Sequence, residues 1–320
     1  MKAFQYQTAD SEEGAVKLLG EDAVLLAGGT SLLNLLKNYV LEPERVVNVS
    51  GIESLGSIEL DGNGARIGAG VRISDILENE TIAKNYPAFV QALQRIGSPQ
   101  IRNMATLGGN LCARTPCWYG NHKLLHDADT DAVRNGDNEY HAIFGNSSVV
   151  TVHASSAAPA LVALGARVRI AGEGGARELP LDNFFVTPGT PYASENVLKT
   201  NELVTHVALG PAQPHSASYE VRHKDSHDWP LSLASVALQM DGKKCTAAKI
   251  CLGAVAPVPW RAAEAEKAIT GAEITEETAA KAADAAVAGA TPLSGNAYKV
   301  QTARACVRRA VLVAALGSWM

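Results

Sequence analysis

The chain has 320 residues and 47% of them are hydrophobic, which is enough for two or three domains around a sizeable, mainly aliphatic core. Its net charge is -5 and it carries no basic stripe, which argues against a nucleic-acid-binding protein. No apolar run reaches the length of a membrane span, and the first residues lack the apolar core of a signal peptide. The sequence therefore predicts a cytoplasmic protein that binds neither nucleic acid nor membrane.

Residues 1 to 55 have the pattern of a small α/β unit. Short apolar runs predict strands, and the stretches with helical spacing lie between them. We expect strands at 4–6, 24–27 and 45–49, and helices at 11–19 and from residue 32 onward.

A glycine turn joins the second of these strands to the second helix, in the stretch AVLLAGGTSLLNLLK. Gly28 and Gly29 can adopt backbone conformations closed to other residues, and they leave no side chain in the way. Successive N–H groups at such a turn, followed by a helix N-terminus, can converge on an anion such as a pyrophosphate. The plainer alternative is an ordinary strand–helix turn.

The next stretch ends in a second glycine pair, ATLGGN at residues 105–110. Two such turns suggest two loops that close on one extended, phosphate-bearing ligand. Neither turn is a G-x-G-x-x-G fingerprint or a Walker loop. Before the second turn we expect strands at 57–60 and 65–70, and helices at 74–77, 82–86 and 88–96.

Residues 111–148 are the least regular part of the sequence, and such a long irregular stretch is usually either functional or disordered. Order returns with predicted strands at 149–154, 167–172 and 201–209, a helix at 158–166 and a loop at 178–185.

The stretch GPAQPHS at residues 210–216 is predicted to be a domain linker. After it, we expect an antiparallel sheet backed by helices. The strands are predicted at 218–222, 232–240 and 245–253, and the helices at 260–270, 275–289 and 296–316.

Four stretches together, AGGTSLLNLLK, QIRNMATLGGNLCARTPCWY, YHAIFG and SSAAPALVALGA, resemble the FAD-binding medium subunit of the xanthine dehydrogenase family of molybdenum hydroxylases. The resemblance covers essentially the whole chain and is strongest to the branch with 4-hydroxybenzoyl-CoA reductase and the aldehyde oxidoreductases. It implies an α+β fold, with a two-lobed FAD-binding domain of the vanillyl-alcohol oxidase and CO dehydrogenase flavoprotein type at 1–212. The lobes would be 1–55 and 56–212, and a C-terminal α+β domain would occupy 216–320.

The resemblance also implies an FAD site without a catalytic acid or base on this chain. The first glycine loop would hold the pyrophosphate, the second would contact FAD, and Ile96 would lie near the adenine. Ser156 would contribute to FAD binding, next to residue 157, where relatives carry an aspartate. Lys224 would approach the flavin. The implied cofactor-binding residues are Ala27, Gly28, Gly29, Thr30, Ser31, Leu32, Ile96, Ala105, Thr106, Gly109, Asn110, Ser156 and Lys224.

Two departures from the relatives stand out. Relatives in this branch hold a [4Fe-4S] cluster with four cysteines of the long loop, whereas here only Cys112 and Cys117 remain. Such clusters need thiolates, normally four, so we expect no [4Fe-4S] cluster on this chain. A Cys/His metal site formed by Cys117 with His122 and His126 is a weaker alternative. The second departure is Ala157, which replaces the aspartate that contacts the flavin in relatives.

The resemblance implies an electron-transfer subunit that works with two partners, a large molybdopterin subunit and a small subunit with [2Fe-2S] clusters. FAD on this chain would pass electrons between those clusters and an outside carrier, while the substrate reacts at molybdenum. Two alternatives stay open: a flavin-binding protein that is stand-alone or has different partners, and a flavin-free structural subunit.

Overall fold

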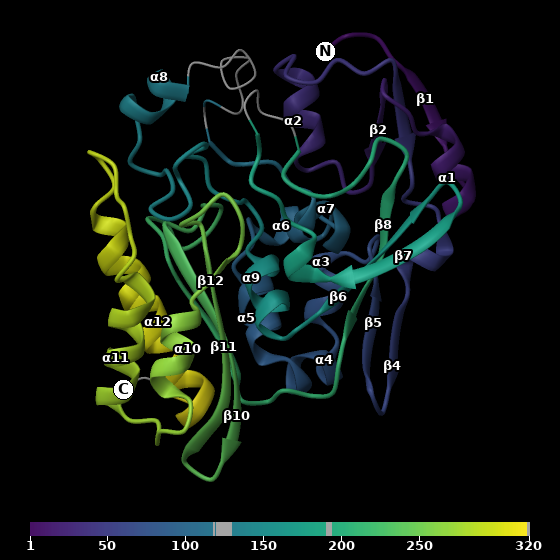
Figure 1. Ribbon diagram of the computed structural model, residues 1–320. Coiled ribbons are helices and arrows are strands. Elements are labelled where there is room, and N and C mark those ends of the chain that lie inside the picture. The colour runs from purple at the N-terminus through teal and green to yellow at the C-terminus, as the bar shows by residue number, and fades with distance from the viewer. Residues whose placement is uncertain (118, 120–129, 190–193, 319–320) are drawn as a thin grey trace.

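The computed structural model describes residues 1–117, 119, 130–189 and 194–318, and it folds them around three β-sheets (Figure 1). No helix among these residues is both long and apolar enough to cross a membrane. The first sheet is parallel, with the strand order β1-β3-β2. Its elements are β1 (Gln5–Thr8), α1 (Glu12–Leu18), β2 (Ala23–Leu26), α2 (Leu32–Lys37) and β3 (Arg45–Asn48).

Helix α1 begins at a position where the sequence carries helix-start signals. The Ser11 side chain accepts a hydrogen bond from the Gly14 N–H, and Glu12 and Glu13 lie in the first turn, where the helix dipole favours acids. Val47 at the centre of the sheet is fully buried. The parallel order places the C-terminal ends of β2 and β3 at one edge, so the loop after β2 emerges there.

The second sheet is antiparallel, with the order β4-β5-β8-β6-β7, and several short helices cover it. One apolar core joins this sheet to α5 and α9 through fully buried residues such as Phe89 and Leu161. The elements are η1 (Glu53–Gly56), β4 (Ile58–Asp61), β5 (Gly64–Gly68), α3 (Ile73–Leu77), α4 (Glu80–Asn85), α5 (Pro87–Gln94), α6 (Pro99–Arg102), α7 (Leu107–Leu111), α8 (Thr130–Asn135), α9 (Ala157–Ala163), β6 (Arg167–Gly172), β7 (Gly175–Pro180), η4 (Leu181–Asn183) and β8 (Leu203–Leu209).

The third sheet is antiparallel, with the order β12-β11-β10-β9, and three helices back one of its faces (Figure 1). The opposite face packs against α5 and α9, so the sheet lies between two helical layers. This confirms the predicted antiparallel sheet backed by helices. Its elements are β9 (Ser216–Val221), β10 (Ser232–Asp241), β11 (Lys244–Gly253), β12 (Trp260–Arg261), α10 (Ala263–Ile269), α11 (Glu276–Val287) and α12 (Tyr298–Leu316).

Three predictions of local structure were wrong. Residues 260–261, predicted as the start of a helix, form strand β12 beside β11. Residues 149–154 are buried and mostly apolar, but they form no strand, and the His153 N–H instead donates to the Ala256 carbonyl at 2.9 Å. The run is apolar because it is buried, not because it belongs to a sheet. Residues 178–180, predicted as loop, end strand β7, whose side chains are almost all exposed. An exposed edge strand carries no alternating apolar pattern that could reveal it.

A segment before α9 belongs structurally with the C-terminal elements. Ile143 and Phe144 lie in the same apolar core as α10, α11 and α12. Lys299 of α12 is 1% exposed, and its ammonium group donates to the carbonyls of Tyr140, His141 and Ala254 at 2.8, 3.1 and 2.7 Å. A buried charge is tolerated only with such partners. The link between β8 and β9 therefore does not divide the chain into two independent units, because residues 140–144 from before the link pack against the helices that follow it.

Candidate functional site

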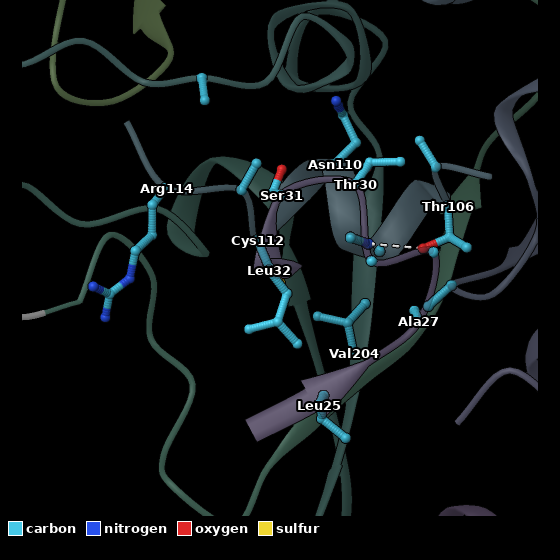
Figure 2. Close-up of a pocket in the computed structure, with 18 of the residues that line it drawn as sticks. Leu25, Ala27, Thr30, Ser31, Leu32, Thr106, Asn110, Cys112, Arg114 and Val204 are labelled. Atoms are coloured by element: carbon cyan, nitrogen blue, oxygen red, sulfur yellow. Dashed lines mark hydrogen bonds between the residues drawn. The ribbon is translucent and has the colours of Figure 1, made fainter. Parts of the chain in front are cut away.

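A pocket of about 600 Å³ lies where the loop after β2 meets α7, α9 and the loop after β9. Its volume is in the usual range for small-molecule sites. Figure 2 shows Thr30, Ser31 and Asn110 close together at its centre, with the apolar side chains of Leu25 and Val204 beneath them. The lining thus combines polar side chains with apolar ones, as an extended ligand with both charged groups and ring systems requires.

The first glycine loop, defined as residues 27–32, offers backbone donors that the protein does not use. Within the described residues, none of the N–H groups of residues 28–32 donates to a protein acceptor. The Ser31 side chain makes no capping bond to α2 either. Backbone donors in folded proteins almost always have a partner, which here has to be a ligand or water. A row of such donors fits an anion.

Gly28 and Gly29 determine the backbone path of the first loop. Gly29 has φ +72°, a left-handed conformation that favours glycine. Gly28 passes so close to the start of the second loop that a Cβ at this position would lie 1.9 Å from the Met104 carbonyl oxygen and 3.0 Å from the Ala105 Cα. The two glycine loops are therefore in direct backbone contact, and any side chain at residue 28 would force them apart.

The second glycine loop, defined as residues 105–110, has already used most of its donors. The N–H groups of Leu107 and Gly108 donate to the Val71 and Ala69 carbonyls at 3.0 and 2.8 Å. The Gly109 N–H donates to the Thr106 hydroxyl at 3.2 Å, which caps α7 and is the dashed line in Figure 2. This loop therefore forms a rigid wall, and it can offer a ligand its side chains more readily than its backbone.

Two neighbouring serines before α9 have different surroundings. The Ser155 hydroxyl donates to the Asn110 amide oxygen at 2.6 Å and accepts from the Ala158 N–H at 2.9 Å. Ser156 lines the pocket and makes no capping bond. Ala157, where relatives were expected to carry an aspartate, is fully buried. Ser155 is thus a structural link between α9 and the second loop, whereas the Ser156 hydroxyl is available to a ligand.

Arg114 is a pocket-lining cation that the sequence reasoning missed. Its Nη1 atom is buried without a hydrogen-bond acceptor in the described part of the chain, and burial lowers the pKa of the guanidinium. Figure 2 shows it on the opposite side of the first loop from Thr106. Nearby, burial raises the pKa of Glu195 to about 7, although the carboxylate accepts from the Thr115 N–H at 2.7 Å. Arg114 lies in the stretch QIRNMATLGGNLCARTPCWY, but nothing in the sequence singled it out there, and Glu195 lies in no motif.

The pocket brings together all the sequence-predicted site residues except Lys224. The residues that line it are Ala27, Gly28, Gly29, Thr30, Ser31, Leu32, Ile96, Ala105, Thr106, Gly109, Asn110 and Ser156. Lys224 lies in the predicted loop but does not line the pocket, and its N–H donates to the Asp228 carboxylate at 2.9 Å. The pocket wall is instead formed by residues 227–230 of the same loop. The roles of these residues toward FAD stay predictions.

Ile96 and the loop after β9 lie at the same end of the pocket, because the His227 N–H donates to the Gly97 carbonyl at 2.9 Å. The placement of Ile96 near the adenine and that of Lys224 near the flavin both stay predictions.

The two remaining cysteines of the long stretch face different surroundings. Cys112 lines the pocket, and burial raises the pKa of its thiol to about 12, so it is a neutral apolar group there. The Cys117 sulfur lies 3.2 Å from His141 Nε2, and burial lowers the pKa of that imidazole to about 4. His122 and His126 lie outside the described residues. Among those described, no three metal-binding side chains come together.

Comparisons with known proteins identify what this architecture resembles. Residues 2–212 match the family described as the FAD binding domain in molybdopterin dehydrogenase, and residues 217–314 match the CO dehydrogenase flavoprotein C-terminal domain. The chain is 33% identical to the aldehyde oxidoreductase FAD-binding subunit PaoB of Escherichia coli K12, over 95% of this chain and 96% of that protein. It is 29% identical to the carbon monoxide dehydrogenase medium chain of Hydrogenophaga pseudoflava, over 96% of each.

Solved structures agree over the full length. Quinoline 2-oxidoreductase from Pseudomonas putida 86 has a chain that is 26% identical, with a TM-score of 0.79 and 100% of both chains covered. Carbon monoxide dehydrogenase from Hydrogenophaga pseudoflava gives a TM-score of 0.78 at 28% identity, covering 98% of this chain and 97% of that one. The unused donors of the first loop and the size of the pocket fit the dinucleotide FAD. The chain belongs to the FAD-binding domain family of the molybdopterin dehydrogenases and is an FAD-binding medium subunit of the molybdenum hydroxylase type.

Proposed function

We propose that this chain is the electron-transfer subunit of a multi-subunit molybdopterin hydroxylase or dehydrogenase. It would hold FAD in the pocket and pass electrons between the [2Fe-2S] clusters of a small partner subunit and an external acceptor or donor. The substrate would react at molybdenum on a large partner subunit, so no catalytic acid or base is assigned to this chain. The flavin supplies the redox chemistry, because it can exchange electrons singly or in pairs.

The observation that carries the proposal is the row of N–H groups at residues 28–32, which have no acceptor within the described protein. Such a row is costly unless a ligand or water accepts from it. The oxygen atoms of a pyrophosphate accept hydrogen bonds from backbone N–H donors of this kind. The Thr30 and Ser31 hydroxyls lie at the same loop and can add to these hydrogen bonds.

The protein would bind the rest of the dinucleotide through shape and apolar contact. Leu25, Leu32 and Val204 line one part of the pocket, and Ile96 and Ile101 line another. These side chains exclude water from the ring systems and fix their position. Relatives whose names describe them as medium chains or FAD-binding subunits of aldehyde oxidoreductase and carbon monoxide dehydrogenase support the assembly with partners.

Two other functions differ from this one in measurable ways. A flavin-binding protein that is stand-alone or has a different partner would bind FAD without molybdenum or iron. A flavin-free structural subunit, suggested by Ala157 and by the lost cysteines, would assemble with the metal-bearing subunits but take up no FAD. The unused donors of the first loop favour a flavin-binding subunit over a structural one.

The test is an absorption spectrum with metal analysis of the chain purified by an affinity tag from cells that also express its neighbouring subunits. The proposal predicts a flavin band together with stoichiometric molybdenum and iron. A complex with molybdenum and iron but no flavin, even after incubation with FAD, would contradict it in favour of the structural subunit. Flavin without molybdenum would favour a stand-alone flavoprotein. Iron that stays with this chain after separation from its partners would contradict the expected loss of the [4Fe-4S] cluster.

A further inference from the structure

Strand β9 carries a buried carboxyl group that the proposed function does not use. Glu220 lies one residue before the end of β9, and its side chain is 6% exposed. It does not line the pocket, but the loop that follows β9 does so through residues 227–230. A carboxylate is rarely buried to this degree unless its oxygen atoms are fully paired.

The ion pair between Glu220 and Arg222 is incomplete. Arg222 Nε lies 3.3 Å from Glu220 Oε1, but neither atom has a hydrogen-bond partner in the described part of the chain. The two terminal nitrogens of the guanidinium instead donate to the carbonyl oxygens of Arg95, at 2.7 Å, and of Asp225. The guanidinium therefore gives this oxygen a nearby positive charge but no hydrogen bond. Burial outweighs that attraction and raises the pKa of Glu220 to about 7.

The charged groups that act on Glu220 lie partly in the pocket wall. Arg95, just after α5, and Asp228 both line the pocket, and their charges act on the pKa of Glu220 in opposite directions. On the other side of the strand, α12 contributes the thiol of Cys306, whose pKa burial raises, so it is neutral. The titratable and charged side chains around the Glu220–Arg222 pair are Arg95, Arg102, Asp225, Asp228, Cys306 and Arg309.

Electron transfer through FAD changes the charge of the pocket. Two-electron reduction takes up one proton and gives the anionic reduced flavin, so the pocket gains one negative charge. In a poorly solvated site, such a charge raises the proton affinity of a nearby carboxylate, because like charges repel. The predicted approach of Lys224 to the flavin would place the flavin, and not the adenine, at the end of the pocket formed by the loop after β9.

We propose that Glu220 takes up a proton from solvent when FAD in the pocket is reduced. Two electrons and one proton convert FAD to its anionic reduced form, and a second proton converts the Glu220 carboxylate to the acid, so the region gains no net charge. The electrons come from the [2Fe-2S] clusters of the partner subunit. Protons can reach Glu220 because β9 is an edge strand that leads into an exposed loop. This inference rests on the proposed function and on the predicted placement of the flavin near that loop.

The test measures the midpoint potential of bound FAD in the complete complex, at pH values on both sides of neutrality, for the wild type and for Glu220→Gln. Below about pH 7, Glu220 is already protonated, so the two potentials should run parallel. Above that pH the wild-type carboxylate is ionised and opposes reduction, so the wild-type potential should fall below that of the variant. The expected gap is about 30 mV for each tenfold increase in proton affinity that reduction causes.

The matched control is Glu266→Gln. Glu266 is also a largely buried glutamate paired with an arginine, since Arg261 donates to both of its carboxylate oxygens at 2.9 Å. It lies on α10 and does not line the pocket. Its replacement should leave the pH dependence of the flavin potential unchanged.

Infrared difference spectroscopy of the wild-type complex tests the proposal without a variant. Reduction above pH 7 should produce the C=O band of a newly protonated carboxyl group, which shifts in D₂O and is missing in Glu220→Gln. Potentials of the wild type and Glu220→Gln that stay parallel over the whole pH range, or the absence of this band, would overturn the inference and leave the proposed function standing. A wild-type complex that takes up no FAD would overturn both.

Discussion

The two glycine loops look alike in sequence but are used differently. The first loop (residues 27–32) leaves the N–H groups of residues 28–32 without a protein acceptor, whereas the second (residues 105–110) donates its N–H groups to Ala69, Val71 and its own Thr106. A pair of glycines therefore marks a place where backbones approach closely, but it does not say whether the partner is a ligand or the protein itself. Here we assign the ligand to the first loop and the structural wall to the second.

The largest effect is expected from Gly28→Ala. The new Cβ would lie 1.9 Å from the Met104 carbonyl oxygen, so the two loops would have to separate. We expect a loss of about 3 kcal/mol or more in the free energy of unfolding, together with loss of bound FAD. Chemical denaturation and the flavin content of the purified protein measure the two effects.

Gly109→Ala is the control for that change. Its Cβ would approach only the Thr106 hydroxyl, at 2.9 Å, and the position is helical, so the free energy of unfolding should change by no more than about 1 kcal/mol. If both substitutions lower the free energy of unfolding by the same amount, close contact with the second loop is not the reason why residue 28 is a glycine.

A smaller effect is expected from Thr106→Val, compared with Ser31→Ala. Thr106 caps α7 through the Gly109 N–H, so its loss should lower stability by about 1 kcal/mol whether or not FAD is bound. Ser31 caps nothing, so its loss should leave the FAD-free protein unchanged and weaken FAD binding. Thermal unfolding with and without FAD separates the two. A stability loss in FAD-free Ser31→Ala would contradict the difference between the loops.

The smallest difference concerns the serines before α9. Ser155→Ala removes a bond to Asn110 and one from Ala158, so we expect a stability loss of about 1 kcal/mol. Ser156→Ala should change only the dissociation constant of FAD, because Ser156 lines the pocket and makes no capping bond. Denaturation and FAD titration of the two variants separate these effects. A stability loss in Ser156→Ala together with weaker FAD binding alone in Ser155→Ala would contradict the assignment.

The sequence predicted the family, the order of most elements and the residues that gather at the pocket. It succeeded because the strand–glycine–helix pattern is local: the same few residues form the strand, the turn and the helix. The C-terminal sheet and its helices were predicted for the same reason, as in α12, whose apolar positions recur at helical spacing.

What the sequence could not predict depends on contacts between distant segments. Lys224 and Trp229 lie in one loop, and the turn at His227, fixed by Gly97, decides which of them reaches the pocket. The apolar run at 149–154 has the composition of a strand, yet it packs as irregular chain against residues near Ala256. Whether a glycine loop has unused donors is likewise decided by neighbours such as Ala69, which are far away along the chain.

The central claim is that the backbone of the first loop, and not that of the second, is the anion site for FAD. Amide hydrogen exchange, measured by mass spectrometry on the protein with and without FAD, tests it most directly. We expect FAD to slow exchange strongly in peptides covering residues 27–32. Peptides covering residues 105–110 should already exchange slowly without FAD and change little, because most of their donors are paired. Protection that FAD confers on residues 105–110 but not on residues 27–32 would show that the anion site lies at the second loop instead.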